Sequence, residues 1–153
     1  MEPNYLLPNK YKIPGWLLLI SGIIGGMFLI ASDFESDILQ VKVLALYDDN
    51  SFLSNQNGQF FKIIENSILD EIIALFIIIG GLLVSFSREK VEDEFIYKLR
   101  KDSFVWAMIF NYLILMLAIV FVYNLSFFNV LVYNMFTPLL FFIARFNFLK
   151  SRV

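Results

Sequence analysis

Four long runs of apolar residues alternate with polar segments along the chain. A helix needs roughly 20 residues to cross a hydrocarbon core of about 30 Å. Runs of suitable length occupy residues 14–32, 67–87, 104–123 and 125–144. Ser67 and Asp70 have the spacing of a capping box, which favours a helix start at the second run. The pattern predicts an all-α membrane protein with four transmembrane helices, in a single membrane domain over residues 1–153.

The polar segments predict how the helices are connected. Only position 124 separates the last two runs, so they are expected to form a tight hairpin, and the bundle is expected to be two antiparallel hairpins. The connection 33–66 is too long for a simple turn. Its stretches QVKVLALY and GQFFKII flank a segment of turn formers, which predicts a small cap, either a β-hairpin or a strand plus a helix.

A cleaved secretory signal is the alternative interpretation of the first run. The best cleavage point follows Ala31, where Leu29 occupies a position that requires a small residue. A retained helix is therefore favoured.

Composition supports the membrane interpretation and limits the chemistry. Hydrophobic residues make up 59% of the chain and charged residues 17%, against about 45–50% and about 25% in soluble domains. The chain has no Cys and no His, which excludes disulfides, Cys nucleophiles, Ser-His-Asp triads and His-ligated metals. No nucleotide-binding or nucleophile-elbow motif is present. We therefore expect no catalytic residues, no cofactor, no metal site and no nucleic-acid partner.

The basic residues predict the orientation in the membrane. Of the 12 lysines and arginines, Lys42 and Lys62 lie between the first two runs, and the other 10 lie on the opposite side of the predicted bundle. Because basic residues are retained in the cytoplasm, the tails 1–13 and 145–153 and the segment 88–103 are expected to be cytoplasmic. The cap is then extracytoplasmic.

Small and polar residues inside the runs predict helix contacts. Small residues let membrane helices pack closely, and the small residues of the first two runs are expected to face each other: Ser21, Gly22, Gly25, Gly26, Gly80 and Gly81. Pro138 leaves the carbonyl of Asn134 without its helical donor. We expect the Asn111 amide or the Thr137 hydroxyl to supply one. Arg145 is expected to be an anchor at the inner interface.

The segment 88–103 is densely charged but has one apolar face. Val91, Phe95, Ile96 and Leu99 would share that face if the segment were helical. Two interpretations stay open: a solvated extension of the neighbouring helices, or an amphipathic surface that meets a partner or lipid headgroups.

Several short stretches of the second half resemble a known family. They are Glu92-Asp93-Glu94-Phe95, Leu99-Arg100, Phe127-Phe128-Asn129-Val130, Tyr133-Asn134-Met135-Phe136-Thr137 and Arg145-Phe146-Asn147. Over residues 65–150 the chain resembles a family of small uncharacterised four-helix bacterial inner-membrane proteins. The resemblance implies a bacterial inner-membrane location and supports four spans, and it brings no activity, cofactor or catalytic residue.

The sequence favours a non-enzymatic membrane protein that acts by contact, as an accessory subunit or a sensor. Its partners would be the lipid bilayer and another membrane or cytoplasmic protein, possibly a second copy of itself. An oligomeric channel or small-solute carrier is the alternative. A lipid-modifying enzyme that uses Asp70 and Glu71 is the least favoured hypothesis, because a position in the first turn of a helix explains both acids more simply.

Overall fold

A computed structural model describes residues 5–31, 40–48 and 59–152 of the chain. Its four long helices are α1 (Lys12–Ala31), α2 (Leu69–Phe86), α3 (Glu94–Phe121) and α4 (Leu125–Lys150). Each is long and apolar enough to cross a membrane, which confirms the prediction of four such helices. A short 3-10 turn, η1 (Asn9–Tyr11), precedes α1, and two strands, β1 (Gln40–Asp48) and β2 (Gln59–Ser67), precede α2.

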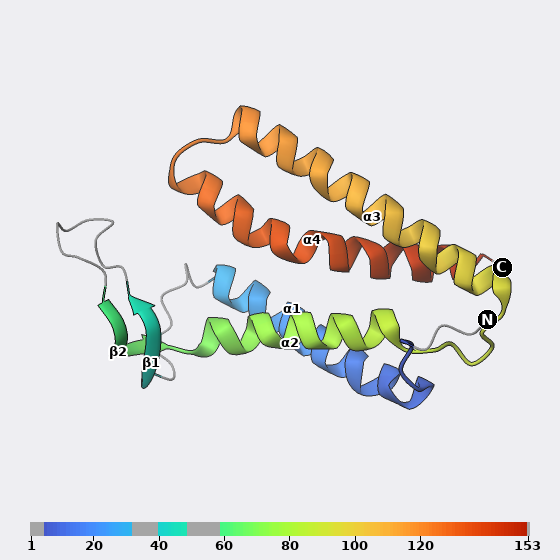
Figure 1. Cartoon of the computed structure of the whole chain (residues 1–153), viewed down its shortest axis with the longest axis horizontal. Helices are drawn as coiled ribbons and strands as arrows, with labels where there is room; N and C mark the ends of the chain where they lie inside the picture. The colour runs from blue at the N-terminus through green and yellow to red at the C-terminus, as the bar shows by residue number, and fades with distance from the viewer. Residues whose placement is uncertain (1–4, 32–39, 49–58, 153) are drawn as a thin grey trace.

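The helices pack as two pairs. α1 packs along α2, α3 packs along α4, and the pairs meet where α2 contacts α4 (Figure 1). The N-terminus, the C-terminus and the α2–α3 connection lie at one end, and the strands lie beyond the opposite end (Figure 1). A tight turn joins α3 to α4, and Asn124 immediately before α4 has a φ of 60°, a left-handed conformation that Asn tolerates.

Helix lengths differ from the predicted spans at the end that holds the termini. α3 begins at Glu94 and has 28 residues, about 42 Å of helix, so roughly a third of its length exceeds a hydrocarbon core of about 30 Å. α4 likewise continues to Lys150. Residues 94–103 are therefore the first turns of α3, which agrees with the interpretation of segment 88–103 as an extension of a neighbouring helix.

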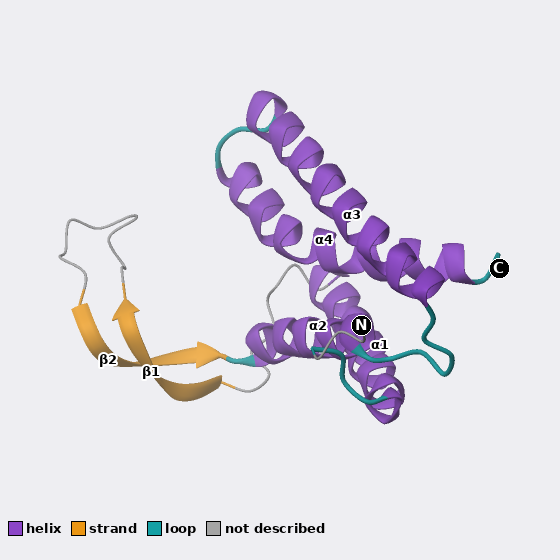
Figure 2. Cartoon of the chain, turned by 45° about the vertical axis from the view of Figure 1, so that its right-hand side comes forward, coloured by secondary structure: helices purple, strands orange, loops and turns teal. Residues whose placement is uncertain are grey.

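The two strands form a β-hairpin, which is one of the two structures predicted for the cap. β1 and β2 pair antiparallel, from Gln40 opposite Ser67 to Asp48 opposite Gln59 (Figure 2). The remainder of the predicted cap, residues 33–39 and 49–58, lies outside the described residues. The predicted capping box is wrong: Ser67 ends β2, and the N-cap of α2 is Ile68, which makes no side-chain cap hydrogen bond.

The core lies between the two helix pairs. Its buried members come from all four helices: Leu19, Ile77, Val84, Ala107, Phe142 and Ile143. Large apolar side chains elsewhere on the helices are exposed, Leu17 by 68% and Phe121 by 74%. Such exposure would be costly in water and is ordinary for helices that face lipid.

Close packing of α1 on α2 depends on glycine, in a register shifted from the predicted one. A Cβ on Gly80 would lie 2.9 Å from the Leu19 Cα, and a Cβ on Gly22 would lie 2.7 Å from the Ile77 Cγ1. Gly80 thus lies opposite Leu19, two to three residues from the predicted Ser21–Gly22 level. Gly15, which was not among the predicted packing residues, would bring a Cβ within 2.8 Å of the Leu83 Cβ.

Two predicted packing residues lie elsewhere. Ser21 is exposed, and its hydroxyl donates to the Leu18 carbonyl of its own helix at 2.9 Å. A Cβ on Gly81 would lie 2.8 Å from the Leu139 Cγ of α4. Consecutive helical residues point about 100° apart, so Gly80 and Gly81 serve two different neighbours. Gly25 and Gly26 approach Ile73, Gly26 only at 3.8 Å.

Candidate functional site

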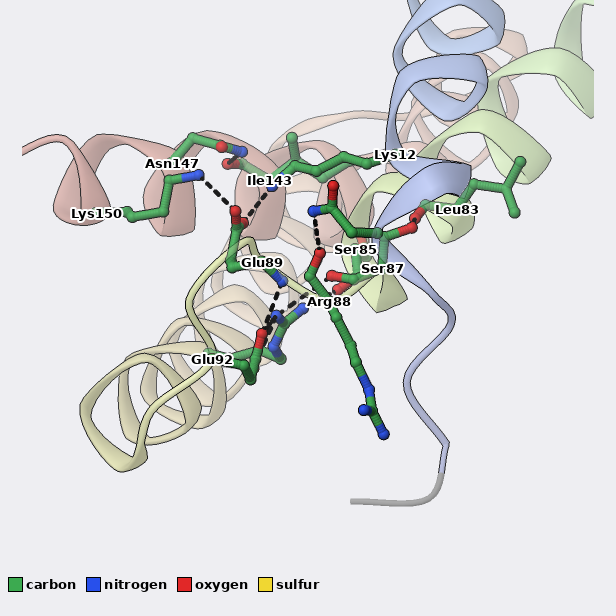
Figure 3. A network of polar contacts seen from close by, with 12 residues as sticks. Lys12, Leu83, Ser85, Ser87, Arg88, Glu89, Glu92, Ile143, Asn147 and Lys150 are labelled. Atoms are coloured by element: carbon green, nitrogen blue, oxygen red, sulfur yellow. Dashed lines mark hydrogen bonds and ion pairs between the residues drawn. The ribbon is translucent and has the colours of Figure 1, made fainter. Parts of the chain in front are cut away.

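Ionised side chains from separate elements meet at the end of the bundle that holds both termini (Figure 3). They are Lys12 at the start of α1, Glu89 and Glu92 in the α2–α3 connection, Arg100 on α3 and Lys150 at the end of α4. We call these five residues the polar cluster. The polar cluster joins the start of α1, the α2–α3 connection with the first turns of α3, and the end of α4.

Glu89 connects the first helix to the last. Its Oε1 pairs with the Lys12 ammonium, and its Oε2 lies 3.0 Å from the Lys150 Nζ. The side chains of Glu89 and Lys12 are only 11% and 15% exposed, and that of Lys150 is 31% exposed. One carboxylate therefore neutralises part of two ammonium charges in a place largely withdrawn from water.

Electrostatics favour the ionised form of Glu89. Burial by itself would raise the pKa of this carboxyl group. The hydrogen bonds and positive charges of Lys12 and Lys150 outweigh the burial, so the pKa of Glu89 is held below its ordinary value. The carboxylate stays charged at neutral pH and holds both lysines.

Arg100 closes the C-terminal end of α2. Its guanidinium donates to the Ser85 carbonyl at 2.5 Å and to the Ser87 carbonyl at 3.4 Å. The Ser85 carbonyl belongs to the last turn of α2, and the Ser87 carbonyl belongs to its C-cap residue. Carbonyls at this end of a helix have no helical donors, and a cation there also interacts favourably with the helix dipole. Glu92 pairs with Arg100 at 3.2 Å and accepts the Glu89 backbone N–H at 2.8 Å.

The N-terminal segment is tied to the same place through its backbone. The Leu7 N–H donates to the Phe86 carbonyl, and the Leu7 carbonyl accepts the Arg88 N–H, both at 2.8 Å. The Asn9 side-chain amide donates to the Arg88 carbonyl at 2.6 Å. The residues that precede α1 are thus held by one parallel β-bridge, Leu7 opposite Ser87, beside the connection that carries Glu89 and Glu92.

Aromatic rings of α4 flank the cluster. Phe146 is 3% exposed, and its ring lies 4.8 Å from the Arg100 guanidinium carbon and 5.9 Å from the Lys150 Nζ. Phe142 stacks on Phe146 with ring centroids 5.9 Å apart. Cation–π attraction is stronger when the cation has lost water, so the Phe146 ring helps to hold both cations.

A cavity of about 500 Å³ opens beside the polar cluster. One wall is α2, with Leu82, Ser85 and Phe86, and the opposite walls are α3 and α4. Arg100 lies at its polar end, and Phe142 lies in its apolar part. The cavity is within the size range of ligand sites, about 300–1,000 Å³.

The predicted apolar face of segment 88–103 exists only in part. Val91 precedes α3 and lies in a bend, so it does not share a helical face with the other three residues. A break was required there because Asp93 caps α3, accepting the Ile96 N–H at 2.8 Å. Val91 is 73% and Phe95 49% exposed, whereas Ile96 and Leu99 are half-buried.

The predicted donor to the Asn134 carbonyl is not found among the described residues. The Thr137 hydroxyl donates instead to the Tyr133 carbonyl at 3.2 Å, because a hydroxyl on a helix reaches the carbonyl four residues earlier. Asn111 is 8% exposed, and its Oδ1 and the Oδ1 of Asn134 have no hydrogen-bond partner. Among the described residues no hydrogen bond joins the Asn111 amide to this region, and Pro138 lines the cavity.

The face of α4 that carries Phe141 and Arg145 does meet α3. Phe141 stacks on Phe110 with centroids 4.4 Å apart, and the Arg145 guanidinium carbon lies 5.3 Å from the Trp106 ring centroid. Arg145, for which an anchoring role at the inner interface is predicted, thus has an aromatic partner within the chain.

Sequence reasoning missed the polar cluster. Lys12, Glu89, Glu92, Arg100 and Lys150 were counted as surface charges that set the orientation. The sequence feature that could have indicated the cluster is the mixture of acids and bases in residues 88–103. Such a mixture favours ion pairs within the protein over a single charged face in solvent. Their partners on α1 and α4 are 77 and 61 residues from Glu89 in sequence, so no local pattern identifies them.

Neither a metal-binding group nor a known relative bears on the role of the polar cluster. No group of three or more acidic side chains within the described residues could hold a metal ion. No protein-family model, curated protein or solved structure matches the chain.

Proposed function

We propose that the chain is a non-enzymatic integral protein of the bacterial inner membrane that acts by contact, as an accessory subunit or a sensor. In this proposal both termini and the polar cluster are cytoplasmic, and the β1–β2 hairpin is extracytoplasmic. The excess of basic residues at the end with the termini supports this orientation. A partner protein would bind at the cytoplasmic end.

One observation carries the proposal: α2 connects the hairpin directly to the polar cluster. Ile68 alone separates β2 from α2. At the other end of α2, the carbonyls of Ser85 and Ser87 are held by Arg100. A force or ligand that displaces the hairpin would therefore move the end of α2 and the cluster to which both termini are tied.

The contact surface proposed for a partner is the exposed apolar pair Val91 and Phe95. They are 73% and 49% exposed and lie close in sequence to Glu92 and Asp93, which are fixed by their own hydrogen bonds. Apolar side chains on a backbone held in this way bind a partner with little loss of conformational entropy.

The channel or carrier alternative is less well supported. It requires glycine-bearing and Asn-bearing faces that turn toward other copies. Gly22 and Gly80 are instead buried between α1 and α2 of one chain, and Asn111 is buried as well.

Site-specific photo-crosslinking in cells tests the proposal. A photoreactive amino acid at Val91 or Phe95 should capture one protein in stoichiometric yield, and the same probe at the lipid-facing Phe121 should not. Replacing both residues by Ser should weaken capture through a second crosslinking position at Lys90 by about tenfold, from the loss of apolar burial. Equal adduct patterns at Phe95 and Phe121, or capture unaffected by the double substitution, would contradict the proposal.

A further inference from the structure

The cavity beside α2 has one polar end and one apolar end. At the polar end lie Arg100 and Lys101, with the rings of Tyr5 and Tyr97. From Arg100 to Met108, which lies farther along the cavity wall, α3 advances about 12 Å. The deeper walls come from apolar side chains such as Leu139 and Phe142.

Polar atoms at the polar end lack partners. Ser85 is 2% exposed and Arg100 5%, and both line the cavity. The Ser85 Oγ and the Arg100 Nε are buried without a hydrogen bond, although the other Arg100 nitrogens are used. A buried donor without an acceptor is costly. A ligand with acceptor oxygens at this point would satisfy both groups once they turn toward the cavity.

The charges at this end favour an anion. Glu92 pairs with Arg100 and offsets its charge. Lys101, at the mouth, has no ion pair to any described residue, so the mouth keeps an excess positive charge. The complementary ligand has a negatively charged, oxygen-rich head and an apolar tail.

We propose that this cavity binds one anionic phospholipid, with an acyl chain along α3 and with its phosphate at Ser85, Arg100 and Lys101. In the structure the Arg100 Nε and the Ser85 hydroxyl are closed to solvent; binding turns both toward the phosphate oxygens, which accept from them, and Lys101 interacts with the negative charge. The chain fills the space between α2 and the α3–α4 pair. This site does not depend on the proposed protein partner, because Val91 and Phe95 do not line the cavity.

Native mass spectrometry of the full chain tests the site. The protein is equilibrated in detergent with equal amounts of phosphatidylglycerol and phosphatidylcholine that carry the same acyl chains. We expect one retained lipid per chain and about a fivefold preference for phosphatidylglycerol, the effect of one basic residue near an anionic headgroup. Inorganic phosphate at the same concentration should not displace it.

Two pairs of variants separate this site from general lipid coating. Lys101→Gln should reduce the preference to less than twofold, whereas Lys98→Gln, on the same helix and outside the cavity wall, should keep it. Met108→Trp should fill the cavity and abolish retention, whereas Met116→Trp, at an exposed position of α3, should not. Circular dichroism checks that each variant is folded.

Several results would overturn the proposal. Equal retention of the two lipids, unchanged in Lys101→Gln, would mean that lipid only coats the protein. Retention that persists in a folded Met108→Trp protein would place the lipid elsewhere. Displacement by inorganic phosphate would show that the apolar chain contributes nothing, and no retained lipid at all would remove the site.

Discussion

Glu89→Gln tests whether the polar cluster stabilises the helix bundle. The substitution keeps the side-chain shape and removes the charge that faces Lys12 and Lys150. Removing one partner of a buried ion pair costs about 3–5 kcal/mol, and an exposed pair contributes less than about 1 kcal/mol. The pair with Lys12 is close to the buried limit and the pair with Lys150, whose side chain is 31% exposed, is intermediate.

We therefore expect Glu89→Gln to lower the free energy of unfolding by about 3 kcal/mol. For a chain of this size that corresponds to a fall in Tm of about 6–12 °C, measured by thermal unfolding in one detergent. Glu94→Gln is the matched control, because Glu94 is an exposed acid of the same segment, and it should change the free energy of unfolding by less than about 0.5 kcal/mol.

A double variant separates the ion pair from other effects. Lys150→Gln alone should be destabilising, but added to Glu89→Gln it should cost little, since its partner is already gone. A Tm for Glu89→Gln equal to that of Glu94→Gln, or fully additive single effects, would refute the role given to this contact.

Three further predictions concern glycine packing, pH and the buried amide. Gly80→Val should destabilise the protein by at least about 2 kcal/mol, because its Cβ would lie 2.9 Å from the Leu19 Cα, whereas Gly26→Val, with its nearest contact at 3.8 Å, should be tolerated; thermal unfolding compares them. Because the pKa of Glu89 is lowered from 4.5, its stabilisation should be complete above about pH 4.5 and lost as the pH falls through the lowered value; a Tm series against pH should show this loss in the wild type and not in Glu89→Gln. Asn111→Leu should leave stability unchanged or raise it by about 1 kcal/mol, since the Asn111 Oδ1 is buried without a partner; a loss of about 1 kcal/mol would instead support an interhelical hydrogen bond.

Features that depend on local pattern could be predicted from the sequence. Length and hydropathy were sufficient for four helices able to span a membrane, because the bilayer fixes how long such a run must be. Alternation in QVKVLALY located β1 to within one residue of Gln40–Asp48. The short α3–α4 turn followed from the single position between two apolar runs.

Features that depend on helix register could not be predicted. The sequence suggested that Gly80 and Gly81 form one pair of small packing residues, yet they contact α1 and α4 respectively. Which helix lies on which side of α2 is set by the tertiary arrangement and not by the local sequence. The spacing of Val91 fits a helical face, but Asp93 is the N-cap of α3, so the helix begins after Val91. The cluster around Glu89 required the relative positions of both chain ends, which no periodicity contains.

The topology of the chain in the membrane is the most direct test of the whole account. The sequence has no Cys, so single cysteines can be introduced at exposed positions without a background: Leu44→Cys on β1, and Val91→Cys and Ser151→Cys at the opposite end. In intact cells a membrane-impermeant maleimide should label Leu44→Cys and leave the other two unlabelled until the membrane is opened. Labelling of Val91→Cys or Ser151→Cys in intact cells, or release of the chain from membranes without detergent, would contradict the account.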